Sequence, residues 1–105
     1  MKTHVSIRHH DYPGRMRDLV EEKLESLSRF YGRVISVKAN LERQNEAHRI
    51  ELVASVGGGS VLVADVQGGT FQDVLDEALA RMVRQLKRHR EKLTVDRRRG
   101  GSIGH

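Results

Sequence analysis

Four cationic side chains recur at spacings of three and four residues near the C-terminal end of the chain: Arg81, Arg84, Arg88 and Lys92. Residues at this spacing share one side of an α-helix, where like charges repel one another unless an anion offsets them. Arg outnumbers Lys in this stretch, and a guanidinium donates two parallel hydrogen bonds to one phosphate. The pattern therefore predicts phosphate binding, and it supplies no group for covalent chemistry.

The positive charge of the chain is confined to this region. Residues 80–99 contain nine Lys or Arg and only Glu91 and Asp96 as acidic residues, a net charge of +7. The preceding 79 residues contain ten basic and twelve acidic side chains, a net charge of −2. A run of charges is often only a solvated helix face, but such a face normally mixes both signs. The imbalance, with an isoelectric point of about 10.1, indicates a polyanionic partner, either nucleic acid or an anionic membrane.

Nucleic acid fits this segment better than a membrane surface. An interfacial helix needs bulky apolar residues free for lipid, whereas the apolar residues here are needed to close a small core. No aromatic residue is placed to stack unpaired bases, which favours structured RNA over single strands. The N-terminus lacks the apolar run of a signal peptide, and nowhere do eighteen apolar residues follow one another. We therefore expect a cytoplasmic protein with no membrane association.

Other site chemistries have weaker support. Cysteine is absent, which excludes disulfides, thiol nucleophiles and thiolate zinc sites. His9, His10 and Asp11 are consecutive, but neighbouring side chains in a strand point to opposite faces, so the usual number of metal ligands is not reached. The glycine run 57–59 lacks the Lys-Ser or Lys-Thr of a phosphate loop, which makes it a turn. No paired carboxylates or nucleophile–base motif is present, so we expect no metal, no cofactor and no enzyme activity.

The element that must position the cations is one long helix. Residues 71–93 keep apolar side chains at the spacing of an amphipathic helix, with Thr70 as its N-cap. The predicted core-facing residues are Phe71, Leu75, Ala78, Leu79, Met82, Leu86 and Leu93. His89 falls within this apolar stripe, where core packing or bonding to a terminal carbonyl is its ordinary role and phosphate contact is the alternative.

The preceding chain predicts a strand, a helix and three further strands. Residues 2–8 alternate as a short strand. A helix follows, with Asp11 as its predicted N-cap and Pro13 in its first turn, and it ends near Gly32. Residues 33–43 alternate with Ile35, Val37, Ala39 and Leu41 inward, and residues 47–56 alternate in the same way. The strand at residues 61–66 is apolar in both alternations, which leaves its inward face open.

This order of elements predicts an α+β fold in a single domain. A β-α-β-β-β-α chain with hairpin-linked strands forms a mostly antiparallel four-stranded sheet, with two helices packed on one face. The domain is expected to span residues 1–93. Residues 94–105 have no hydrophobic periodicity and predict a basic, disordered tail.

Residues 84–93 read Arg-Gln-Leu-Lys-Arg-His-Arg-Glu-Lys-Leu, and this run resembles the closing helix of ribosome hibernation-promoting factors. The family, also called ribosome-associated inhibitors or sigma-54 modulation proteins, has a pattern close to R-Q-L-x-K-H-K-x-K-L there. Further similar positions are Lys23-Leu24, Leu27, Phe30-Tyr31, Arg33, Val34, Phe71 and Leu75-Asp76. Gly69 stands where the family commonly has an acidic residue. The sequence does not include the separate C-terminal domain of long members, so it resembles either a short form or a shortened long form.

The resemblance implies a domain arranged like double-stranded-RNA-binding domains, which occupies the tRNA and mRNA channel of the small ribosomal subunit. It would contact ribosomal RNA there, compete with tRNA and mRNA, and silence idle ribosomes during stress or stationary phase. With Arg81 added from the cationic stripe, the candidate RNA-binding residues are Lys23, Arg81, Arg84, Lys87, Arg88, His89, Arg90 and Lys92. The alternative is a transcription-linked protein-interaction module, which predicts a protein partner and weak salt dependence.

Overall fold

Seven elements make up the fold in the computed structural model, which describes residues 1–8, 12–29 and 32–102, with side chains described as far as Lys92. The elements follow the predicted order, with one short 3-10 helix added after the first α-helix. They are β1 (Lys2–Arg8), α1 (Gly14–Glu25), η1 (Ser26–Arg29), β2 (Val34–Gln44), β3 (Ala47–Val56), β4 (Ser60–Gly68) and α2 (Phe71–Ser102).

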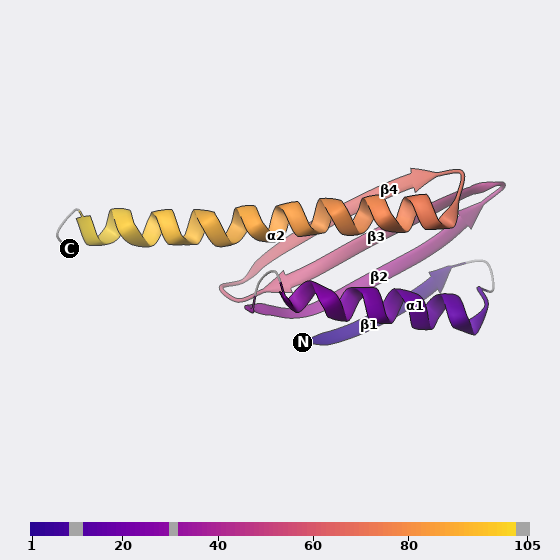
Figure 1. Cartoon of the computed structure of the whole chain (residues 1–105), viewed down its shortest axis with the longest axis horizontal. Coiled ribbons are helices and arrows are strands. Elements are labelled where there is room, and N and C mark those ends of the chain that lie inside the picture. The colour runs from indigo at the N-terminus through magenta and orange to yellow at the C-terminus, as the bar shows by residue number, and fades with distance from the viewer. Residues whose placement is uncertain (9–11, 30–31, 103–105) are drawn as a thin grey trace.

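The four strands form one sheet in the order β1-β2-β3-β4. Strand β1 runs parallel to β2, because α1 carries the chain back across the sheet, and the two hairpin-linked pairs are antiparallel. Figure 1 shows both helices running along the same side of the sheet. The predicted α+β fold, with a mostly antiparallel sheet and two helices on one face, is confirmed.

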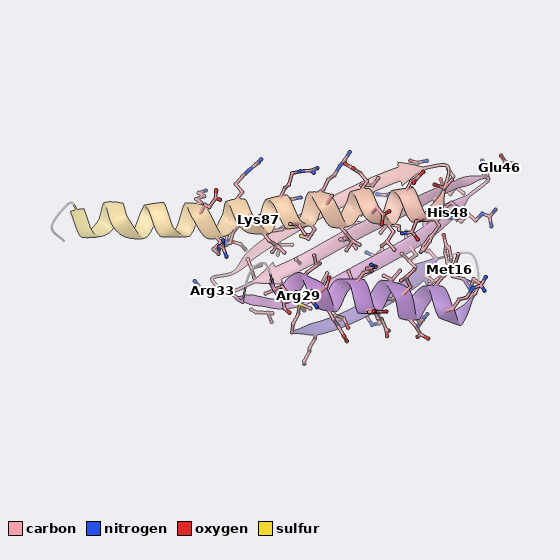
Figure 2. All side chains as sticks on the ribbon, viewed as in Figure 1. Met16, Arg29, Arg33, Glu46, His48 and Lys87 are labelled. Carbon is pink, nitrogen blue, oxygen red and sulfur yellow. The ribbon has the colours of Figure 1, made fainter. Side chains whose placement is uncertain are left out.

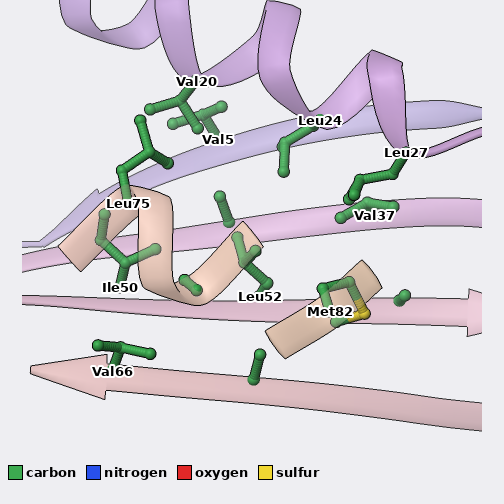
Figure 3. Packing of buried hydrophobic residues seen from close by; sticks show 14 of the residues in the cluster. Val5, Val20, Leu24, Leu27, Val37, Ile50, Leu52, Val66, Leu75 and Met82 are labelled. Carbon is green, nitrogen blue, oxygen red and sulfur yellow. The ribbon is translucent and has the colours of Figure 1, made fainter. Parts of the chain in front are cut away.

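The core fills the space between the sheet and the two helices (Figures 2 and 3). Leu24, Leu27, Leu75, Met82 and Leu86 are among the fully buried side chains, and the part of the chain that the structure describes buries no polar or charged residue. Each large aliphatic side chain removed from water contributes about 1.5–3 kcal/mol. The packing is close where α2 begins, because a Cβ at Gly68 would lie 3.0 Å from Val74 Cγ2.

Strand β2 differs from the prediction at its first residues. Ile35, predicted to face inward, is 58% exposed, whereas Val34 is buried at 6%. The pairing of β2 with β3 shifts register between Val34 and Ser36. One extra residue in a strand reverses the facing of its neighbours, so the alternation seen from Val37 onward does not extend back to Ile35.

The face of β4 that the sequence left open is settled by the structure. Ala64 and Val66 are buried under α2, and Val61 and Val63 are exposed on the opposite face of the sheet. The glycine run before this strand makes a turn, as predicted. Gly58 and Gly59 have φ of +94° and +85°, a conformation that side chains with a Cβ rarely adopt.

Helix α1 is shorter than predicted. It ends at Glu25 and tightens into η1, where the hydroxyls of Ser26 and Ser28 donate to the carbonyls of Lys23 and Glu25 at 2.6 and 3.0 Å. Such side-chain bonds compete with regular helix geometry. Pro13 occupies the N-cap position, and Asp11, predicted as the cap, lies outside the described residues.

Helix α2 is longer than predicted. The expected end at Leu93 is wrong, because the helix continues to Ser102. The segment from residue 94 onward lacks apolar periodicity, which removes tertiary packing but does not itself stop a helix. Arg is a good helix former, and the chain offers no Gly or Pro between Phe71 and Gly100.

Candidate nucleic-acid interface

Helix α2 packs on the sheet only along its first half. Among the side chains that the structure describes, its buried residues are Phe71, Val74, Leu75, Ala78, Met82 and Leu86; Leu93, predicted to face the core, lies beyond the described side chains. The last turns of the helix project past the sheet (Figure 1). The whole molecule measures 57 × 22 × 19 Å, and the cationic end of α2 extends along its longest axis.

One flank of α2 carries the predicted cationic row. Arg81, Arg84, Arg88 and Lys92 are all exposed, but the first two have a partner within the fold. Arg81 Nε donates to Glu77 Oε1 at 2.9 Å, and Arg84 Nη2 lies 3.7 Å from the same oxygen. Glu77 therefore pairs with both arginines.

Arg81 also reaches the edge of the sheet. Its Nη1 donates to the carbonyl of Asp65 at 3.4 Å, and one turn further along Gln85 Nε2 donates to the carbonyl of Val63 at 2.6 Å. Both carbonyls belong to β4, the last strand of the sheet, whose outer backbone groups pair with no other strand. These two side chains therefore seal part of the edge, and Arg81 has a structural role whatever else it binds.

A second flank carries Lys87 and Arg90. Arg90 is nine residues from Arg81, which is about 180° around a helix with 3.6 residues per turn. It therefore lies on the flank away from the β4 edge, on the side of α1. Figure 2 shows Lys87 near the end of the sheet where Arg29 and Arg33 also lie, two exposed arginines that were not among the predicted candidates.

Arg29 and Arg33 escaped the sequence analysis because they are isolated in the chain. Arg29 ends η1, and Arg33 stands directly before β2. The Arg33 side chain lies over Gly57, where an added Cβ would be 3.0 Å from Arg33 Nε. The only available signal was Arg33 in the family resemblance, and only the fold brings both residues to the end that carries Lys87.

Lys23 and His89 stand apart from the two flanks. Lys23 is exposed on α1 and lines a hollow with Glu22, Glu25, Ser26 and Arg29. Two carboxylates therefore share this hollow with Lys23. His89 is half-buried between exposed Arg88 and Arg90. Its placement at the margin of the core agrees with its position in the apolar stripe, and its contact with phosphate stays a prediction.

The uncovered face of the sheet has mixed charge. Arg49 donates to both carboxylate oxygens of Asp65 and lies 3.8 Å from Glu42, while Asn40 donates to Glu51 at 2.9 Å. The hydrogen bonds from Arg49 hold the pKa of Asp65 below its usual range, and they raise the pKa of Arg49 itself. Cations here are offset locally, so this face is a poor anion-binding surface compared with α2.

Three aromatic rings meet where α2 begins. Tyr12, His48 and Phe71 have ring centroids 5.5–6.1 Å apart, and the Tyr12 hydroxyl lies 3.1 Å from His48 Nδ1. Burial, reinforced by the charge of Arg43, lowers the pKa of His48, and burial raises the pKa of Tyr12. The cluster links the loop before α1, the start of β3 and the start of α2. No local sequence pattern indicates it, because the three residues are far apart in the chain.

The described part of the chain contains neither a cluster of metal-binding side chains nor a helix suited to span a membrane. Within residues 1–8, 12–29 and 32–102, no group of three or more His, Asp or Glu could hold a metal ion; His9, His10 and Asp11 lie outside these ranges. Over the same part of the chain, no helix is long and apolar enough to cross a membrane.

A four-stranded sheet beneath two helices, one of them ending in a dense cationic segment, defines a small α+β domain with one strongly basic end. The sequence profile of the family described as Sigma 54 modulation protein / S30EA ribosomal protein matches residues 3–94. The chain belongs to this family, as the resemblance in the sequence predicted.

Two relatives carry the same name. Ribosome hibernation promoting factor of Azotobacter vinelandii is 30% identical over 100 residues, which cover 95% of this chain and 92% of the relative. The protein of that name from Pseudomonas putida is 26% identical over 92 residues, which cover 88% and 89% of the two chains.

Two solved structures have the same fold. The Thermus thermophilus Protein Y N-terminal domain matches with a TM-score of 0.74 and 24% identity, over 85% of this chain and 99% of that one. A ribosomal subunit interface protein from Coxiella burnetii matches with a TM-score of 0.78 and 14% identity, over 87% and 99%.

Proposed function

We propose that this protein is a ribosome-binding hibernation factor that inhibits translation by occupying the tRNA and mRNA channel of the small ribosomal subunit. Membership of the family and the names of the relatives support a ribosome-associated hibernation role. The observation that carries the finer proposal is the arrangement of exposed cations on two flanks of α2, at the end that projects beyond the sheet.

Two flanks require a particular shape of partner. Arg88 and Lys92 lie on the flank shared with Arg81, and Arg90 lies about 180° around the helix from Arg81. A flat surface can contact only one flank at a time. A channel with phosphates on both sides contacts both, and the second flank adds Arg29 and Arg33 from η1 and the β2 start to its cationic surface.

Inhibition then follows from occlusion and requires no chemistry. Residues 1–93 form the ribosome-binding domain, and the binding residues are the predicted set Lys23, Arg81, Arg84, Lys87, Arg88, His89, Arg90 and Lys92. A protein seated in the channel excludes tRNA and mRNA, which silences ribosomes that are idle under stress or in stationary phase. Binding energy comes from phosphate neutralisation, and six or more contacts imply a loss of about 10³-fold in affinity or more between 50 and 200 mM salt.

The test is co-sedimentation of the full chain with small ribosomal subunits across a salt series, with and without initiator tRNA. We expect pelleting that falls steeply with salt and is lost when tRNA occupies the channel. Strong pelleting that is insensitive to salt would instead support the protein-interaction module, and absence of pelleting at low salt would reject the proposal.

A charge-matched pair of variants locates the interface. Arg84→Gln, Arg88→Gln and Lys92→Gln together should abolish pelleting at physiological salt. The control combines Arg15→Gln, Arg17→Gln and Lys38→Gln, which removes the same charge from exposed positions on α1 and β2. Equal loss of binding in both variants would show that net charge alone matters and that α2 is not the interface.

A further inference from the structure

The last turns of α2 extend past the region that the family profile matches. The family profile ends at residue 94, while the helix runs to Ser102. Sixteen residues of α2 follow Leu86, its last buried residue among the described side chains, and at 1.5 Å per residue they span about 24 Å. This segment, residues 87–102, is called the arm from here on.

The composition of the arm restricts what it can bind. It contains seven Lys or Arg against Glu91 and Asp96, and Arg97, Arg98 and Arg99 all follow the family-matched region. Its only aliphatic residues are Leu93 and Val95, too few for the continuous apolar stripe by which a helix docks into a protein groove. A strongly cationic helix without such a stripe fits the phosphate backbone of RNA.

We infer that residues 94–102 extend the RNA-binding surface as a helical arm, which contacts phosphates that residues 1–93 cannot reach. The inference rests on the proposed function for the identity of the RNA, but the phosphate contacts that it describes apply to any RNA duplex. A helix holds three arginines at a fixed distance from the core, whereas a flexible tail of the same charge would lose conformational entropy on binding.

Two variants separate charge from helical geometry. A chain that ends at Leu93 removes the three arginines, and Val95→Pro keeps every charge but breaks the helix, because proline lacks the backbone donor and clashes with the preceding turn. Val95→Ala is the matched control, since it keeps the helix. Each is assayed for binding to a 16-base-pair RNA duplex and to small ribosomal subunits over a salt series.

We expect the shortened chain to bind at least tenfold more weakly than the full chain at 0.1 M salt. The slope of log affinity against log salt should fall in magnitude by about 2–3, at about 0.9 per phosphate contact for a duplex. Val95→Pro should bind at least threefold more weakly than Val95→Ala. An unchanged slope after shortening overturns the inference, and a Val95→Pro variant equal to Val95→Ala overturns its helical part.

The two substrates distinguish this inference from the proposed function. If the duplex shows the effect while small subunits do not pellet with the full chain, the arm is supported and the ribosomal assignment fails. If subunits pellet equally well with the full and shortened chains, the ribosomal assignment stands and the arm fails.

The absence of cysteine permits a positional test. Ser102→Cys provides a single attachment point for an iron–EDTA probe at the tip of the arm. Glu46→Cys, in the β2–β3 hairpin at the opposite end of the molecule (Figure 2), is the control. We expect RNA cleavage from the Ser102→Cys probe, at positions that the control does not cut. No cleavage in a complex that still forms would show that the arm tip lies away from RNA.

Discussion

The two halves of α2 both carry arginines and use them differently. Between Phe71 and Leu86 the helix lies on the sheet, and the cation at Arg81 is bonded to Glu77 and to the edge of β4. Between Lys87 and Lys92 no side chain is fully buried, and the last turns of the helix project past the sheet (Figure 1). An arginine is thus a structural or a binding residue according to what lies beside the helix at that turn, and its spacing in the sequence is the same in both cases.

The halves also differ in what keeps them helical. The first half is held by burial of one face, the main source of helix stability in proteins. The arm depends on helix propensity and on continuation from the packed half. A substitution that removes packing in the first half should therefore destabilise the whole domain. A substitution in the arm should leave the core intact.

The largest expected effect is a cavity in the packed half. Met82→Ala should lower the free energy of unfolding by about 2–5 kcal/mol, because the Met82 side chain is fully buried between α2 and the sheet. Urea denaturation followed by circular dichroism measures the change. Val95→Ala in the arm is the comparison and should shift the free energy by less than about 0.5 kcal/mol. Equal destabilisation by the two variants would show that the halves fold as one packed unit.

A smaller effect tests the seal on the β4 edge. Gln85→Ala should cost about 1 kcal/mol of stability, since it removes a 2.6 Å hydrogen bond that joins α2 to the carbonyl of Val63 on the β4 edge. Gln72→Ala is the matched control on the same helix, because its exposed bond joins Gln72 to Asp76 one turn away. We expect the control to cost about 0.2–0.5 kcal/mol. A larger loss from the control would contradict a structural role for Gln85.

The smallest effect concerns the aromatic cluster that fixes the start of the packed half. The pKa of His48 is lowered in the folded protein, so below its ordinary value of 6.5 the unfolded chain binds more protons than the folded one. Stability should therefore decline as pH falls below about 6.5 and toward the folded pKa. Thermal unfolding from pH 8 to pH 5 measures this decline, with His48→Gln as the reference variant, which should show less of it.

The same cluster has an alkaline limit. Burial raises the pKa of Tyr12, so the folded state retains the phenolic proton at a pH where the unfolded chain has lost it. Stability from this group is complete below pH 10 and should decline above it. Tyr12→Phe removes the bond to His48 and should cost about 0.5–1.5 kcal/mol at pH 7. A variant as stable as the parent would show that ring packing alone holds the cluster.

Apolar periodicity gave correct predictions for the elements whose structure depends on burying one face. The order of elements, the buried side of α2 and the inward residues from Val37 onward all follow from apolar spacing, and the structure confirms them. Ile35 was misplaced because a register shift in β2 leaves no mark in the local pattern. The end of α2 was misplaced because helix propensity continues where apolar periodicity stops.

The candidate site was only partly predictable. Spacing places Arg84, Arg88 and Lys92 on one flank, but it cannot show that Glu77 and the β4 edge already engage Arg81. Arg29 and Arg33 join the basic end through the fold, as Tyr12, His48 and Phe71 join their cluster. Such associations depend on residues distant in the chain, which no local pattern records. RNA contact by the predicted residues stays a prediction.

The projecting part of α2 carries the net charge of the protein, whereas most of its residues lie in a body that is neutral overall. Residues 1–86 contain twelve basic and twelve acidic side chains, so they are neutral as a whole, and the full excess of +5 belongs to residues 87–102. A neutral body with a charged arm at one end of a 57 Å molecule has a large electric dipole along its length. In the field of a polyanion such a molecule turns before it touches. The protein should therefore approach RNA with its arm leading. The association rate constant should be higher at low ionic strength, because the electric field then favours one orientation more strongly.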